Sequence, residues 1–190
     1  MLGWLKSRRD RRQVARSLYG SSVTAARAAI FYAEWGVADT LQGRFEMLAL
    51  HVALILGRLS RGAEPERRLG RALTEAFVVD MDDSMRELTF GDLAVPREIK
   101  RATAALFDRH AAYLAALAGT PDMSLSDALA SQLAYLNRGK GLKPDRLSDY
   151  VERCAQALDA QPAAQILAGR IEWPDPAATV WPRRPGDAAH

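Results

Sequence analysis

The sequence predicts an all-α protein: a single helical domain of about six to eight helices around a central apolar helix at residues 41–59. Apolar residues recur at the 3.6-residue helical period over most of the chain, and Gly, Pro and Ser separate the periodic stretches. Val, Ile and Thr never alternate with polar residues over four or more positions, so no strand is expected. The 190 residues are 48% hydrophobic, which is enough for one substantial core.

The first half of the chain contains helices of different character. Residues 4–19 and 21–34 are predicted helices separated by a break at residues 19–22, and residues 36–40 form a loop. Residues 41–59 are apolar around nearly the whole helix, which is typical of a helix at the centre of a domain. Residues 60–62 end this helix, and residues 67–88 form the next one, with Pro65 at its start.

The second half of the chain continues in the same way. Residues 96–118 form a helix with Pro96 in its first turn, and a capping box of Ser124 and Asp127 begins the helix at residues 125–137. Residues 145–158 form the last long helix, and residues 173–190 hold four of the nine prolines without periodicity. We therefore expect a basic segment at residues 1–16 that joins the first helix, a helical domain at 17–172 and a flexible tail at 173–190.

The positive charge of the chain is concentrated at its N-terminus. Residues 1–16 contain six basic residues and one acid, a net charge of +5, and since the whole chain carries +3, the remainder carries −2. Arg8, Arg9, Arg11 and Arg12 follow Trp4, with Leu2 and Leu5 beside it. Such a segment is suited to contact with an anionic membrane surface or with ribosomal RNA. A solvated, frayed helix end explains the same pattern.

Several enzyme and metal-site classes are absent from the sequence. Cys154 is the only cysteine, which excludes an intrachain disulfide and zinc sites built on paired cysteines. No Gly-rich phosphate loop, nucleophile elbow or Glu-x-x-His motif occurs. His51 lies in the most apolar helix, where a core role is expected before a metal or haem role. We therefore expect no enzymatic activity and no bound cofactor.

Charged residues at regular helical spacing flank the turn between the predicted helices at 67–88 and 96–118. Helical spacing places Asp80, Asp83 and Glu87 on one side, and Gly91 with Asp92 interrupts the helix. This order indicates a shaped surface. Three simpler explanations remain: the acids are a solvated helix face, Arg86 pairs with Asp82 or Asp83, and Asp92 caps the turn.

Several segments match a known family in order and spacing across about residues 14–160. They include Leu18 and Tyr19 ahead of residues 36–40, residues 43–51, residues 81–100, and Phe107 with Arg109 and Tyr113. In these segments the chain resembles the ubiquinol–cytochrome c chaperone family, the assembly factors for cytochrome b of respiratory complex III. It departs from the family pattern at the turn, where residues 89–92 read Thr-Phe-Gly-Asp in place of Gly-Val-Gly-Asp, and at Asp108, where the family often has Gly.

The resemblance implies an assembly chaperone that binds newly made cytochrome b and supports its haem loading and incorporation into complex III. Composition and the start of the chain favour the bacterial form, at work in the cytoplasm and peripheral at the inner membrane. Mitochondrial relatives act with a small partner protein at the ribosomal tunnel exit, and the need for such a partner stays open here. The alternative is a helical RNA- or ribosome-binding protein that uses its basic N-terminus; DNA is not an expected partner.

Under this resemblance, the charged residues between 80 and 100 are the candidate surface for the client protein, cytochrome b. Its predicted residues are Asp80, Asp83, Arg86, Glu87, Asp92, Arg97 and Lys100, with Asp39 and Arg44 as secondary candidates.

Overall fold

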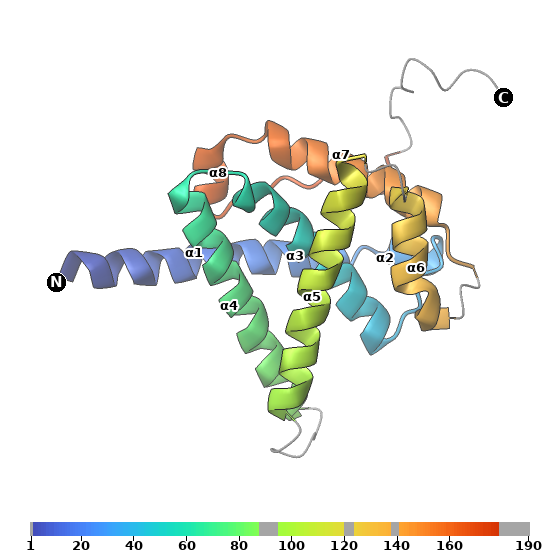
Figure 1. The fold of residues 1–190 in the computed structure, drawn as a ribbon, viewed down its shortest axis with the longest axis horizontal. Coiled ribbons are helices and arrows are strands. Elements are labelled where there is room, and N and C mark those ends of the chain that lie inside the picture. Colours follow the sequence, from blue (N-terminus) through green and yellow to red (C-terminus); the bar gives the residue numbers. More distant parts are fainter. Residues whose placement is uncertain (1, 88–94, 120–123, 138–140, 179–190) are drawn as a thin grey trace.

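The computed structural model describes residues 2–87, 95–119, 124–137 and 141–178, and every helix expected above lies within them (Figure 1). The elements in order are α1 (Leu2–Ala26), α2 (Ala29–Ala33), α3 (Leu41–Ser60), α4 (Glu64–Glu87), α5 (Val95–Leu117), α6 (Leu125–Asn137), α7 (Pro144–Ala160) and α8 (Ala163–Leu167). No strand occurs among these residues, so the predicted all-α class is confirmed.

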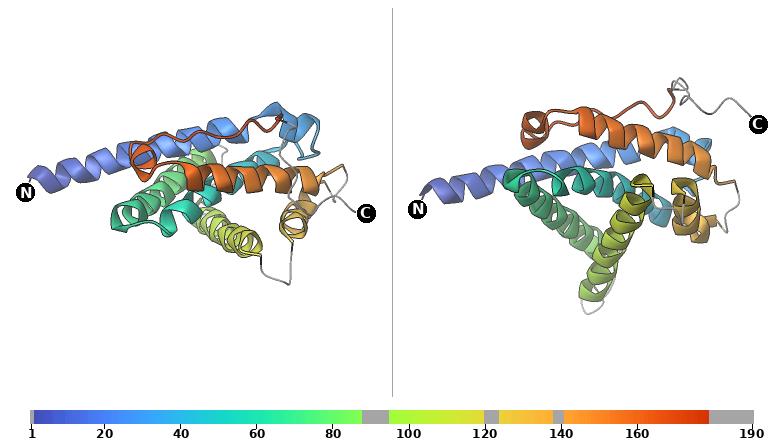
Figure 2. Two further views of the ribbon diagram at one scale, coloured as in Figure 1. Left: turned by 90° about the horizontal axis from the view of Figure 1, so that it is seen from above. Right: turned by 45° about the horizontal axis from the view of Figure 1, so that its top comes forward.

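Helix α3 is the centre of the fold, as predicted for residues 41–59. It contacts α1, α4, α5, α6 and α7, and most of its residues are buried. Helices α1 and α7 run along the molecule on one side of it (Figure 2). Helices α4 and α5 meet this layer at separate points, near α8 and near α7, and converge at the end opposite α7 (Figure 1). We call them the α4–α5 hairpin.

The predicted break at residues 19–22 is wrong, because α1 continues to Ala26. The predicted helix at residues 21–34 is wrong for the same reason, since the chain turns at Arg27 and Ala28 and α2 begins after them. Leu18, Tyr19 and Ser22 are buried in this part of the helix. The Ser22 hydroxyl donates to the carbonyl of Leu18 at 3.1 Å, a bond within the helix and not a cap. Packing in the core thus outweighs the cost of Gly20 in a helix, which is about 1 kcal/mol.

The predicted ends of α3 to α7 lie within a few residues of the observed ones. Side-chain caps fix where α3 and α6 begin. The Thr40 side chain accepts a hydrogen bond from the Gly43 amide at 3.1 Å and begins α3. The Ser124 hydroxyl accepts from the Asp127 amide at 3.1 Å, which is the first bond of the predicted capping box, and it donates to the Asp127 carboxylate at 2.6 Å. Helix α8 was not predicted, because five residues are too short for a periodic pattern.

The segment after α8 returns to the helical body. The indole Nε1 of Trp173 donates to the Ser21 hydroxyl at 2.9 Å, and its ring lies edge-on to His51 with 5.0 Å between ring centres. Trp173 thus contacts the body although it begins the predicted tail. Residues 179–190 of that tail lie outside the described residues, so its flexibility stays a prediction.

His51 is a buried core residue with both ring nitrogens engaged. Its Nδ1 lies 2.7 Å from the carbonyl oxygen of Met47, so Nδ1 carries the proton, and Nε2 accepts from the Tyr150 hydroxyl at 2.9 Å. Burial lowers the pKa of His51 to about 4, although the Met47 carbonyl acts in the opposite direction. The side chain therefore joins α3 to α7 as a neutral imidazole.

A buried ion pair joins α3 to α5. The Glu46 side chain is fully buried, and the Arg109 guanidinium donates to both of its carboxylate oxygens. Tyr135 of α6 donates to the same carboxylate at 2.6 Å. Burial alone would lower the pKa of Arg109, but the bond to Glu46 raises it. One carboxylate thus fixes the positions of three helices.

Replacement of Arg109 by methionine should destabilise the protein by about 3–5 kcal/mol, because it leaves the Glu46 charge buried without its partner. The double variant Glu46→Leu/Arg109→Met should recover part of this loss, since the charge leaves with its partner. Urea unfolding of both variants measures the difference. A loss below about 1 kcal/mol for Arg109→Met would show that the pair does not hold the helices.

The neutral state of His51 should make stability depend on pH. Its pKa is about 4 in the folded protein and about 6.5 when unfolded, so the unfolded chain binds more protons between these values. The stabilisation is complete above pH 6.5, and about 2 kcal/mol of it should be lost by pH 5. Unfolding at several pH values measures this slope, which His51→Gln should flatten and the terminal His190→Gln should leave unchanged.

Candidate functional site

The predicted charged surface lies at the converging end of the α4–α5 hairpin. Asp80 and Asp83 belong to the C-terminal part of α4, whereas Arg97 and Lys100 belong to the first two turns of α5. Asp83, Arg97 and Lys100 are exposed. The structure therefore brings these four residues to one end of the molecule from both sides of the turn (Figure 1).

Three further predicted residues lie wholly or partly outside the described part of the structure. Arg86 and Glu87 belong to the last turn of α4, but their side chains are outside the described part of the structure. Asp92 lies in the segment between the helices, outside the described residues. Their place on the surface therefore stays a proposal, as does the pairing of Arg86 with a neighbouring acid.

Asp80 has a structural contact that the sequence did not reveal. Its carboxylate accepts a hydrogen bond of 2.6 Å from the Tyr19 hydroxyl of α1. Burial, with this bond to Asp80, raises the pKa of Tyr19 far above its usual range, so the phenol keeps its proton. Asp80 therefore holds α4 against α1 while its half-buried side chain borders the exposed end of the hairpin.

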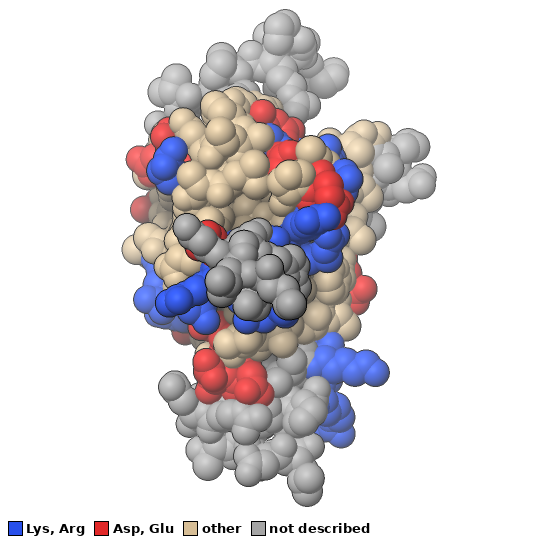
Figure 3. Space-filling model, turned by 90° about the vertical axis from the view of Figure 1, so that its left-hand side faces the viewer, with Lys and Arg blue, Asp and Glu red and all other residues tan. Residues whose placement is uncertain are grey.

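Charges of opposite sign separate across the hairpin. Acids outnumber the base Arg86 at the end of α4, and bases outnumber the acid Glu98 at the start of α5. Acidic and basic side chains lie on different sides above this end (Figure 3). The result is a surface with an acidic side and a basic side, which is suited to an extended charged partner.

Each helix of the hairpin also exposes a large apolar residue that the sequence analysis missed. Val79 is 57% exposed and lies four residues before Asp83, on the same helical face. Phe107 is 47% exposed and lies two turns after Lys100, again on the same face. The helical spacing of Val79 to Asp83 and of Lys100 to Phe107 can be seen in the sequence. The sequence does not show that the two apolar side chains are exposed.

The secondary candidates Asp39 and Arg44 pair with each other. Arg44 Nε donates to the Asp39 carboxylate at 2.7 Å, and the guanidinium lies over the Tyr32 ring, 5.7 Å from its centre. The bond to Asp39 raises the pKa of Arg44. Both side chains are 55% exposed. The pair closes the loop before α3 and lies on a different part of the chain from the hairpin surface.

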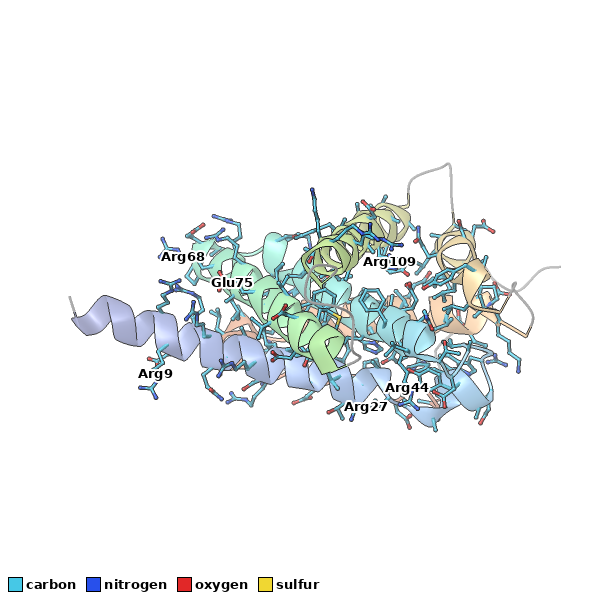
Figure 4. The ribbon with its side chains drawn as sticks, turned by 90° about the horizontal axis from the view of Figure 1, so that it is seen from below. Arg9, Arg27, Arg44, Arg68, Glu75 and Arg109 are labelled. Carbon is cyan, nitrogen blue, oxygen red and sulfur yellow. The ribbon has the colours of Figure 1, made fainter. Side chains whose placement is uncertain are left out.

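The N-terminal arginines lie on α1, whose N-terminal end projects past the rest of the molecule (Figure 1). Arg8, Arg9 and Arg12 are exposed and Arg11 is half-buried, while the side chain of Trp4 is outside the described part. Figure 4 shows Arg9 on the side of α1 away from Arg68 of α4. Arg9 thus lies on a different side of α1 from the arginines that face α4.

The described residues form neither a metal-binding cluster nor a membrane-spanning helix. No group of three or more His, Cys, Asp and Glu side chains there is arranged to hold a metal ion. Within the same residues, no helix combines the length and apolar character that crossing a bilayer requires.

Comparison with known proteins places these features in a family. A family model described as ubiquinol–cytochrome c chaperone matches residues 33–173. The crystal structure of the Cbp3 homolog from Brucella abortus is similar to this chain with 31% sequence identity and a TM-score of 0.74, covering 93% of this chain and 98% of that chain. A search of curated proteins found no match. Since the family model matches well over half of the chain and the solved homolog aligns over nearly its whole length, the chain belongs to the ubiquinol–cytochrome c chaperone family.

Proposed function

We propose that the protein is an assembly chaperone that binds newly made cytochrome b and supports its haem loading and incorporation into complex III. Family membership supports a role in the assembly of this complex and favours a non-enzymatic function. Haem in this proposal is cargo of the client, so no cofactor of the chaperone is required.

The combination of charge and apolar surface on the α4–α5 hairpin supports this proposal. Newly made cytochrome b is a multi-span membrane protein, so it offers apolar segments flanked by charged ones. Cytoplasmic loops beside such segments are rich in Lys and Arg, which suits the acidic side of the hairpin around Asp83. Val79 and Phe107 supply exposed apolar contacts beside the charges.

The place of action follows from the client. Cytochrome b is inserted into a membrane during synthesis, so we propose that the chaperone works in the cytoplasm at the surface of the inner membrane. Further contacts in this proposal are the ribosome or the anionic membrane through α1, and a small partner protein as in mitochondria.

Charge reversal at the hairpin tests the client surface. The variant Asp83→Lys/Glu87→Lys in the full chain should capture newly made cytochrome b roughly tenfold less, because attraction to a basic client segment becomes repulsion. Co-purification from membranes of the host, with the amount of assembled complex III, is the measurement.

A matched variant controls for net charge. Glu34→Lys/Asp149→Lys reverses two exposed acids away from the hairpin, one directly after α2 and one on α7, and should leave capture unchanged. Unchanged capture by the folded hairpin variant would refute the proposed surface. Absence of cytochrome b from material purified with the wild-type chain would refute the chaperone proposal itself.

A second pair of variants separates the two roles of Asp80. Tyr19→Phe removes the hydroxyl that binds Asp80 and should lower the free energy of unfolding by about 1.5–3 kcal/mol without weakening capture. Asp80→Ala should lower both stability and capture if the carboxylate also contacts the client. Equal capture by the two variants at a temperature where both are folded would assign Asp80 to the fold alone.

A further inference from the structure

Two adjoining pockets lie where the N-terminal part of α1 packs against α4. The first has a volume of 390 Å³ and contains five arginines among its lining residues, Arg8, Arg11, Arg12, Arg68 and Arg71. The second has a volume of 530 Å³ and shares the lining residues Arg11 and Arg68 with the first, so the two lie side by side. Three of these arginines were predicted as a contact segment, but Arg68 and Arg71 of α4 were not.

Positive charge exceeds negative charge in the first pocket. Glu75, the acid in its lining, lies 4.0 Å from Arg12. Arg68 and Arg71 each donate to one oxygen of Glu64 at 2.9 Å, and these two bonds lower the pKa of Glu64 to about 2. The two pockets together are lined by these five arginines and by three acids, Glu64, Glu75 and Asp10, which leaves a net charge of +2. Repulsion among like charges at such close range favours a bound anion.

The second pocket adds an apolar region to the basic one. Its lining includes Val14, Pro65, Leu69 and Leu167, which come from α1, α4 and α8. Leu167 is 36% exposed. A ligand that fills both pockets therefore needs an anionic group next to an apolar one. A phospholipid has this chemistry, because glycerol joins its phosphate to the acyl chains.

Single-stranded RNA fits the same pockets less well. Proteins that bind it usually stack bases on aromatic side chains. Among the described residues that line the two pockets, none is aromatic. The apolar region likewise has no counterpart in a sugar–phosphate chain.

The position of the pockets agrees with a membrane. They lie beside the projecting end of α1, and basic side chains surround this end (Figure 3). Leu2, Trp4 and Leu5 precede the arginines on the same helix. Apolar and tryptophan residues next to arginines are typical of helices that lie at a membrane surface.

We propose that the pockets between α1 and α4 dock the protein on a membrane by binding an anionic phospholipid. The phosphate lies among the five arginines, and the apolar part beside it contacts Leu69 and Leu167. This site does not require the client, so it is tested without cytochrome b, and its failure leaves the chaperone proposal standing.

The experiment measures binding of the full chain to vesicles of phosphatidylglycerol and phosphatidylcholine by flotation. Arg68→Gln/Arg71→Gln should bind roughly tenfold to thirtyfold more weakly, because each basic residue near an anionic surface contributes about fivefold. Both arginines are largely exposed, so the variant should fold, which circular dichroism verifies. Lys143→Gln/Arg146→Gln, an equal loss of charge at the start of α7, should change binding less than about twofold.

Two further variants should change the strength of vesicle binding in opposite directions. Glu64→Gln frees Arg68 and Arg71 from their ion pairs and should tighten vesicle binding several-fold. Leu167→Ser keeps every charge but removes apolar contact, so it should weaken vesicle binding roughly threefold. Unchanged vesicle binding in Arg68→Gln/Arg71→Gln and in Glu64→Gln would overturn the proposal. Loss of ribosome or RNA binding in these variants, with vesicle binding intact, would also overturn it.

Discussion

The buried charge of Glu46 is the constraint on which the rest of this fold depends. Helix α3 is covered by other helices on nearly every side, and a carboxylate inside such a core must be paired. Arg109 brings α5 to this carboxylate and Tyr135 brings α6. Because α5 is one half of the hairpin, the same ion pair also determines where Arg97 and Lys100 lie.

The other half of the hairpin is held by a second polar contact. Tyr19 of α1 binds Asp80 near the end of α4, and the aromatic ring of Tyr19 also packs edge-on against Phe77. The two helices are therefore anchored separately, α4 to α1 and α5 to α3, before they converge. A hairpin fixed in this way can present charged and apolar side chains at its exposed end without losing its own position.

The helices that the sequence predicted correctly are those that depend on residues close together along the chain. Helical period, caps and breaking residues identified α3 to α7 within a few residues, because all three depend on neighbours along the chain. The continuation of α1 through Gly20 was missed, since it depends on the burial of Leu18 and Tyr19. Of the site, the sequence indicated the charged stretch at residues 80–100. It could not show the Tyr19–Asp80 bond, which spans 61 residues, or the meeting of Arg68 with Arg11.

Helix α4 carries both proposed surfaces and separates them by charge. Arg71 and Asp80, the nearest opposite charges of the two surfaces, are nine residues apart, so they lie about 13.5 Å from each other along the helix, more than one screening length at physiological salt. The two surfaces therefore act on their partners independently. An anionic membrane attracts the arginine end and repels the acids at the hairpin end. A docked molecule would hold its acidic surface away from the lipid, at the level where basic loops of a membrane protein leave the bilayer.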